Sequence, residues 1–144
     1  MAMQIVYLLV DSPVRKNTQL AHNNMQSIID HANTSDIEVC GFILADNGDL
    51  KTEPAKNIAV YQNDVFEIHP LEILRHMKTG KIAAIYHTHP SSGEQESKFD
   101  RFNCENSCIP YVIYSKESQK FNLLIPKKAH VNKEYIQLLK QKYD

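Results

Sequence analysis

Two unbroken apolar runs most constrain how this chain can fold. Residues 39–44 (VCGFIL) and 82–87 (IAAIYH) are too short for typical helices and show no alternation of polar and apolar residues. Runs of this kind are typical of strands buried inside a sheet. The first run is followed by Asp46-Asn47-Gly48-Asp49, which predicts a tight hairpin turn, and Pro90 stops the second run soon after its end. A central β-sheet is therefore expected.

Helical segments alternate with these strands. Apolar residues recur at helical spacing over residues 18–33, and residues 70–77 have Pro70 at the first helical position and Gly80 beyond the end. A helix is also predicted to begin near Ser97. The other predicted elements are strands at 5–10, 50–58, 111–114 and 121–125 and a helix at 132–142. The predicted fold class is α/β, with a central mixed β-sheet flanked by helices, in a single domain over residues 1–144.

Composition excludes several classes of function. The 144 residues fit one domain, and 16 basic against 17 acidic residues leave a net charge of −1. No basic surface is therefore expected to drive binding to nucleic acid. The longest apolar run, residues 5–10, is too short for a membrane span and lacks the features of a signal peptide. Three cysteines, an odd number, argue against a disulfide framework, so a cytoplasmic protein is expected.

The cysteines and sheet tyrosines are interpreted as structural. Cys104 and Cys108 share a face of the predicted helix and are expected to be buried thiols rather than a redox pair or a second metal site. Cys40 is expected in the core. The tyrosines expected to pack along the strands are Tyr61, Tyr86, Tyr111 and Tyr114.

Two histidines stand at the end of the second apolar run. His87 and His89 are separated by one residue, so in a strand both side chains project from the same face. Two neutral imidazoles side by side suit a transition metal, most commonly zinc. A lone His-x-His pair fits ordinary polar residues at a strand end as well, so it is weak evidence by itself.

A third candidate ligand follows a short polar loop. Ser97 and Asp100 stand three residues apart at the opening of the predicted helix, on one face of its first turn. Asp100 would add an oxygen ligand, and three protein ligands with one open position are typical of catalytic zinc, which lowers the pKa of water toward ~7. The alternative is a capping box, in which Ser97 and Asp100 bond the exposed amides. We expect an Asp100 that ligates metal not to cap the helix as well.

A zinc-activated water that attacks a carbonyl also needs a carboxylate to accept and return a proton. Glu38 is the candidate, because it stands at the start of the first apolar run and can reach a cleft at the sheet edge. The alternative is a solvated residue before a strand, and composition does not decide between the two.

Together these residues resemble the signature of the JAMM/MPN metalloprotease family. That signature is a Glu, then His-x-His-Pro, six residues, and Ser-x-x-Asp. This chain has Glu38, then His87-Thr88-His89-Pro90, six residues, and Ser97-Lys98-Phe99-Asp100. The resemblance covers about residues 19–125.

The resemblance implies a role for each residue of the signature. His87, His89 and Asp100 would bind Zn²⁺, Glu38 would be the general acid and base, and Ser97 would hydrogen-bond the tetrahedral oxyanion. It also implies a fold like that of cytidine deaminases and hydrolysis of a peptide or isopeptide bond. Deaminase chemistry itself is excluded, because the chain has no Cys-x-x-Cys pair and Thr88, not Glu, follows the first histidine.

Segments outside the signature are similar to one branch of the family, the amino-terminal domain of the tail assembly K proteins of tailed phages. They are Cys104 beyond the ligand Asp, the strand with Pro110 and Tyr111, and the segments Asn57-Ile58-Ala59 and Phe66-Glu67-Ile68. Proteins of this branch usually carry a second, NlpC-type cell-wall peptidase domain. The 144 residues are expected to hold no such domain, so wall hydrolysis is not an expected activity.

The resemblance implies two classes of function. The first is a zinc-dependent metallopeptidase with a protein or peptide substrate, acting in phage or prophage tail-tip assembly. Its partners would be tail-tip proteins, in the bacterial host cytoplasm or in the virion tail. A deubiquitinase-like or sulfur-carrier-processing peptidase shares the same five residues. The second class is a virion structural or assembly subunit whose zinc site is present but whose hydrolytic activity is dispensable.

Overall fold

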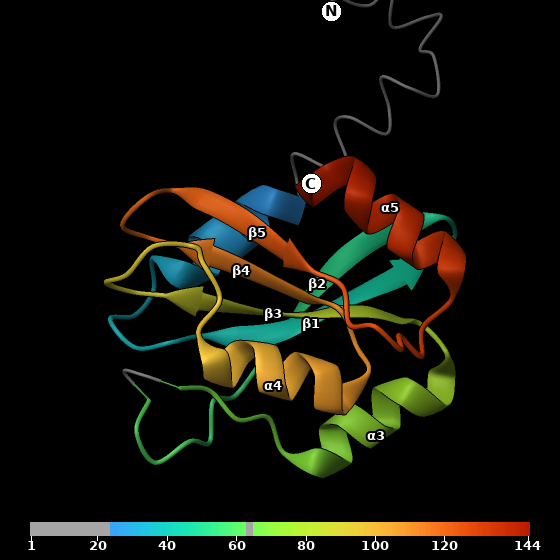
Figure 1. The fold of residues 1–144 in the computed structure, drawn as a ribbon, viewed down its shortest axis with the longest axis horizontal. Helices are drawn as coiled ribbons and strands as arrows, with labels where there is room; N and C mark the ends of the chain where they lie inside the picture. Colours follow the sequence, from blue (N-terminus) through green and yellow to red (C-terminus); the bar gives the residue numbers. More distant parts are fainter. Residues whose placement is uncertain (1–23, 63–64) are drawn as a thin grey trace, which may run out of the picture.

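The computed structural model describes residues 24–62 and 65–144, and its centre is a mixed sheet with the strand order β2-β1-β3-β4-β5 (Figure 1). Strands β3 and β4 are parallel, and the other neighbouring pairs are antiparallel. The bounds are Cys40–Asp46 for β1, Asp49–Ala55 for β2, Ile82–His89 for β3, Tyr111–Ser115 for β4 and Lys120–Leu124 for β5. The predicted α/β class and mixed sheet are confirmed.

The predicted hairpin joins β1 to β2. Asn47 has φ 52° and Gly48 has φ 85°, so both turn residues are left-handed, as a two-residue turn of type I′ requires. The turn sets the register, which pairs Asp46 with Asp49 and Cys40 with Ala55. The strand predicted at residues 5–10 lies outside the described residues.

Helices cover both faces of the sheet (Figure 1). Helices α3 (Pro70–Thr79) and α4 (Lys98–Ser107) lie on one face, and α5 (Lys133–Tyr143) lies on the other together with a helix over residues 24–32. Helix α3 has Pro70 at its start and ends at Gly80, whose φ of 69° is left-handed and whose N–H donates to Met77 O. No helix in the described residues is long and apolar enough to cross a membrane.

The strand side chains alternate between two cores. Ile43 and Tyr86 pack on the face of α5, whereas Phe42 and Ile85 pack on the face of α3 and α4. Cys40 and Cys104 are buried in the second core, as expected, while Cys108 is only half-buried; all three thiols are free.

The prediction that Tyr61 packs along a strand of the sheet is wrong. Tyr61 is 75% exposed and lies outside the strands, whereas Tyr86, Tyr111 and Tyr114 are buried within them. Tyr61 follows the short apolar stretch Ile58-Ala59-Val60, but this stretch lies outside the strands and Val60 is exposed as well.

Candidate metal centre

The two histidines lie on β3, the central strand of the sheet, between β1 and β4. All eight residues of β3 are buried, and the strand places His87 and His89 on the face covered by α3 and α4. Strand β1 runs antiparallel to β3 and pairs Cys40 with His87, so Glu38, just before β1, comes to the same end of the sheet as His89. The C-terminal end of β3 is therefore where the candidate ligands and the candidate base converge.

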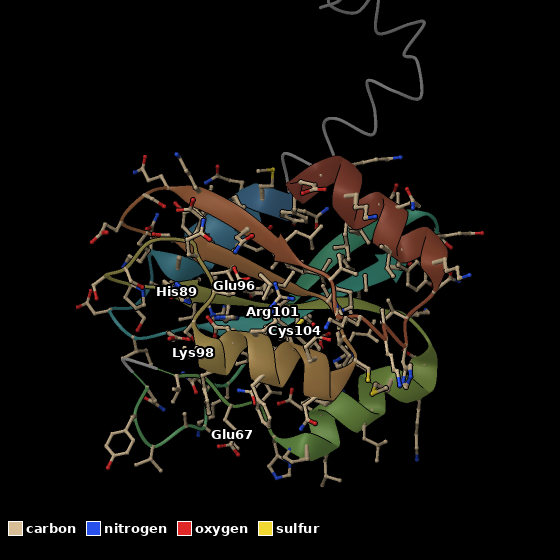
Figure 2. All side chains as sticks on the ribbon, viewed as in Figure 1. Glu67, His89, Glu96, Lys98, Arg101 and Cys104 are labelled. Carbon is tan, nitrogen blue, oxygen red and sulfur yellow. The ribbon has the colours of Figure 1, made fainter. Side chains whose placement is uncertain are left out.

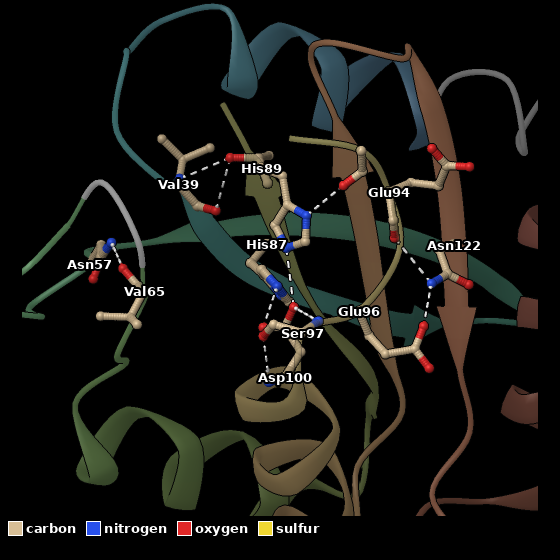
Figure 3. A network of polar contacts seen from close by, with 12 residues as sticks. Val39, Asn57, Val65, His87, His89, Glu94, Glu96, Ser97, Asp100 and Asn122 are labelled. Atoms are coloured by element: carbon tan, nitrogen blue, oxygen red, sulfur yellow. Dashed lines mark hydrogen bonds and ion pairs between the residues drawn. The ribbon is translucent and has the colours of Figure 1, made fainter. Parts of the chain in front are cut away.

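The start of α4 brings Asp100 onto the histidines (Figure 3). Asp100 Oδ1 lies 3.1 Å from His87 Nε2, and Asp100 Oδ2 lies 3.1 Å from His89 Nε2. One candidate ligand atom from each of the three residues lies within 4.8 Å of the others, and all three residues are buried. The predicted ligand set is thus brought together in space.

His87 has the environment of a neutral ligand. It is fully buried, Phe66 stacks on its ring at a centroid distance of 4.4 Å, and Tyr111 meets it edge-on. Neither ring nitrogen makes a hydrogen bond to the described residues, although Nε2 is close to Asp100. Burial lowers the pKa of His87, which favours the neutral imidazole that binds metal. A buried nitrogen left without a hydrogen bond fits a metal ligand.

The orientation of the His89 ring is set by a contact at Nδ1, the nitrogen that does not face Asp100. Its Nδ1 lies 2.7 Å from the carbonyl oxygen of Gly93, which leaves Nε2 facing Asp100. Burial alone would lower the pKa of His89, but the contacts with Asp100 and the Gly93 carbonyl outweigh it and raise the pKa.

Asp100 corrects one expectation from the sequence, because it caps the helix while facing the histidines. Ser97 Oγ accepts a hydrogen bond from Asp100 N at 2.9 Å, and Ser97 N donates to Asp100 Oδ2 at 3.0 Å, so the capping box is complete. A carboxylate has about four acceptor positions, so capping and facing a metal are compatible. Burial favours the neutral acid, but the contacts with His87, His89 and Ser97 N–H outweigh it and hold the pKa of Asp100 well below its usual range.

Glu38 is not a solvated residue. It is 5% exposed, its N–H donates to Gln62 O at 2.8 Å, and its carbonyl accepts from Asn57 Nδ2 at 2.8 Å. Asn57 Oδ1 in turn accepts from the N–H groups of Ala59 and Glu67. Both backbone groups of Glu38 are therefore held by the segment that follows β2.

The role of Asn57 was not predicted from the sequence. In the sequence, the segment Asn57-Ile58-Ala59 shows only a likeness to one branch of the family, and a single Asn gives no signal of which groups it bonds.

The candidate base and the ligands share one cleft. It has a volume of about 510 Å³ and contains Glu38, Ser97 and two of the three candidate ligands, His89 and Asp100. The loop between β3 and α4 forms its wall through Pro90, Ser91, Ser92, Gly93 and Gln95. The loop therefore borders the site and leaves it open to a cleft.

The donor set fits zinc. Two imidazoles and one carboxylate are ligands found in catalytic zinc sites, and three protein ligands leave a position for water or substrate. Glu38 and the hydroxyl of Ser97 lie in the cleft beside them. Such an arrangement can bind a substrate carbonyl next to a metal, a base and a hydrogen-bond donor.

Comparison with known proteins gives three findings. The family model of prokaryotic homologs of the JAB domain matches residues 22–125, a range that contains all five site residues. Tail tip assembly protein K of Escherichia phage N15 is 26% identical over 78 residues, which are 54% of this chain. The match covers 32% of that protein, so this chain corresponds to about a third of its length.

The third finding concerns the fold alone. The solution structure of protein DSY2949 from Desulfitobacterium hafniense superposes with a TM-score of 0.56 at 22% identity. The superposition covers 74% of this chain and 83% of that one.

Proposed function

Because the chain belongs to the family of prokaryotic homologs of the JAB domain, a JAMM/MPN-like family, we propose that it is a zinc-dependent metallopeptidase. It would hydrolyse a peptide or isopeptide bond in a protein or peptide substrate. The observation that carries the proposal is the shared cleft, in which Glu38 stands beside the buried group of His87, His89 and Asp100. A purely structural metal site would need neither an open cleft nor a buried carboxylate next to it.

His87, His89 and Asp100 would hold the metal through Nε2, Nε2 and a carboxylate oxygen. Zinc, when bound there, supplies a Lewis acid that polarises a carbonyl and makes water acidic near neutral pH. The pKa of Asp100 is held well below its usual range, so this ligand is ionised at any pH at which the protein would work. The lowered pKa of His87 keeps that ring neutral.

Glu38 would handle the proton. Its carboxylate would accept a proton from the attacking water and return it to the leaving amine, the task of a general base that then acts as an acid. The Ser97 hydroxyl would donate to the oxyanion that forms on the substrate carbonyl. Because Ser97 Oγ already accepts from Asp100 N, its own hydrogen remains available to donate toward the cleft.

Tail-tip assembly is the proposed context. The likeness to tail tip assembly protein K supports it, and so tail-tip proteins are the proposed partners, met in the host cytoplasm or in the virion tail. The same likeness favours a second candidate, a tail assembly subunit in which hydrolysis is dispensable, because that relative is named for assembly.

The test of hydrolysis is Glu38→Gln, with Glu67→Gln as the matched control on the exposed part of the adjacent segment. Each zinc-loaded protein is incubated with a proteome-derived peptide library, and new termini are counted by mass spectrometry. We expect Glu38→Gln to bind zinc normally and to lose about 10²–10⁴-fold in cleavage rate, while Glu67→Gln cleaves like the wild type. Cleavage by Glu38→Gln at the wild-type rate would contradict the proposed role.

The two candidate functions are separated in the phage or prophage that carries the gene. A required peptidase predicts that Glu38→Gln abolishes infectious tails, as deletion of the gene does. An assembly subunit predicts that Glu38→Gln tails are infectious and that only the deletion stops assembly.

A further inference from the structure

The β4–β5 hairpin supplies no candidate ligand, but it is hydrogen-bonded to the loop between β3 and α4. Ser115, the last residue of β4, donates its hydroxyl to Ser92 O. Asn122 of β5 donates Nδ2 to Glu94 O at 3.0 Å (Figure 3). The two bonded carbonyls belong to the residues on either side of Gly93. Both anchors come from the β4–β5 hairpin, which lies beside β3 in the sheet.

The residue between the two anchors is the one that contacts His89. Gly93 O lies 2.7 Å from His89 Nδ1. Glycine has the widest backbone freedom of any residue, so its carbonyl does not hold one direction without outside restraint. Because Ser92 O and Glu94 O are both held by the hairpin, the Gly93 carbonyl between them is kept pointing at His89.

The restraint is part of a larger network of hydrogen bonds and one ion pair. Ser115 is fully buried, and its hydroxyl oxygen also accepts from Ser118 N at 3.0 Å, so both its donor and its acceptor are used. Asn122 Nδ2 also donates to Glu96 Oε1 at 3.0 Å, and Glu96 Oε2 lies 2.7 Å from Arg101 Nη2 on α4 (Figure 3; the Glu96 and Arg101 side chains are labelled in Figure 2). The hairpin thus holds the loop at Gly93 and again just before α4, the helix that carries Asp100.

A carbonyl oxygen hydrogen-bonded to Nδ1 determines which ring nitrogen of His89 can bind a metal. When Nδ1–H donates to Gly93 O, the ring carries its lone pair on Nε2, the nitrogen that faces Asp100. Partners of this kind fix the tautomer and ring orientation of metal-binding histidines. Without the carbonyl, the ring can turn or take the other tautomer, and the ligand set loses a properly directed donor.

We propose that Ser115 and Asn122 are positioning residues of the metal site, which hold the Gly93 carbonyl on His89 and so set its zinc affinity. The inference rests on one part of the proposed function, that the site binds zinc, and does not require hydrolysis. Neither residue is among the candidate ligands or lines the cleft, and neither belongs to the five-residue signature.

The test measures zinc affinity, with no substrate needed. Metal-free wild type, Asn122→Leu and Asn122→Asp are titrated with Zn²⁺ against a chromogenic chelator at one pH. Ser118→Ala is the matched control, because its hydroxyl donates to the Glu94 side chain and not to a loop carbonyl. The melting temperature of each metal-free protein is recorded, and affinities are compared where all are folded. In the zinc-loaded proteins, the His89 Nδ1–H proton is followed by NMR.

We expect Asn122→Leu and Asn122→Asp to bind zinc about 10–100-fold more weakly and to lose the slowly exchanging Nδ1–H signal, with Ser118→Ala unchanged. Asn122→Asp is the more stringent test, because an added negative charge by itself would strengthen zinc binding, the opposite of the expected result. A merely structural role would lower the melting temperatures and leave both zinc readouts as in the wild type, and that result would overturn the assignment. Wild-type protein that binds no zinc would overturn the proposed function together with it.

Discussion

Among single residues, Asp100 makes the strongest link between fold and site. Its two carboxylate oxygens face two histidines, and one of the same oxygens accepts the Ser97 N–H that starts α4. The first turn of α4 therefore sets the position of this candidate ligand, and any shift of that turn would move it. A side chain with several acceptor positions makes this double use possible.

Gly41 is the residue at which the sheet tolerates no side chain. A Cβ there would lie 2.5 Å from Glu53 O and 2.5 Å from a ring carbon of Tyr86. We expect Gly41→Ala to lower the free energy of unfolding by about 1–3 kcal/mol through overpacking, measured by urea unfolding. Gly93→Ala is the control, since a Cβ there meets nothing within 4 Å, and its effect should stay within about 0.5 kcal/mol. Equal stabilities of the two variants would contradict this reading.

The buried thiols predict a loss of stability at alkaline pH. Burial raises the pKa of both Cys40 and Cys104 to about 12, whereas an unfolded thiol titrates near ~8.5. The stability that these groups contribute is therefore complete below the unfolded pKa and is lost as pH rises. Between about pH 8.5 and 10 we expect up to about 1.4 kcal/mol lost per pH unit for each thiol, measured by urea unfolding. Cys104→Ala should make the pH dependence shallower, and an unchanged slope would refute the thiol explanation.

Among elements, helix α4 shows how much a local signal can predict. Ser-x-x-Asp in the sequence predicts both a helix start and a candidate ligand; the structure confirms the helix start and places Asp100 beside His87 and His89. The six-residue apolar runs likewise predict β1 and β3, because a short unbroken run between turn signals leaves few alternatives. These predictions succeed where the information lies within a few neighbouring residues.

The elements that hold the site from a distance could not be predicted this way. Asn57 bonds Glu38 across 19 positions, and Asn122 bonds Glu94 across 28. Asparagine in a polar stretch or an edge strand has the same local pattern whether it faces water or a backbone carbonyl. Only the folded sheet, in which β2 lies next to β1 and β5 next to β4, brings these partners together.

Ser97 has a structural contribution that can be measured apart from catalysis. Its hydroxyl caps α4 by accepting from Asp100 N. Ser97→Ala should lower the free energy of unfolding by about 1 kcal/mol, while Ser97→Thr, which keeps the hydroxyl, should lose much less. Urea unfolding of the metal-free proteins checks this. Equal stability of the Ala and Thr variants would mean that the cap contributes nothing.

At the scale of the whole molecule, the sheet brings the residues of the candidate site together. Glu38, His87 and Asp100 span more than sixty positions of the chain, yet they meet at one end of β3, because β1 runs beside β3 and α4 packs on the face that carries the histidines. The family match covers this whole region.

The measurement that tests the central claim most directly is the metal content of the purified, chelator-free protein by elemental analysis, beside His87→Ala/His89→Ala. The proposal predicts about one zinc per chain in the wild type and none in the double variant. The same kind of donor set also binds Fe(II) in oxygenases, so the analysis must identify the metal as well as count it. Wild-type protein without zinc, or a double variant that keeps it, would contradict the proposed site.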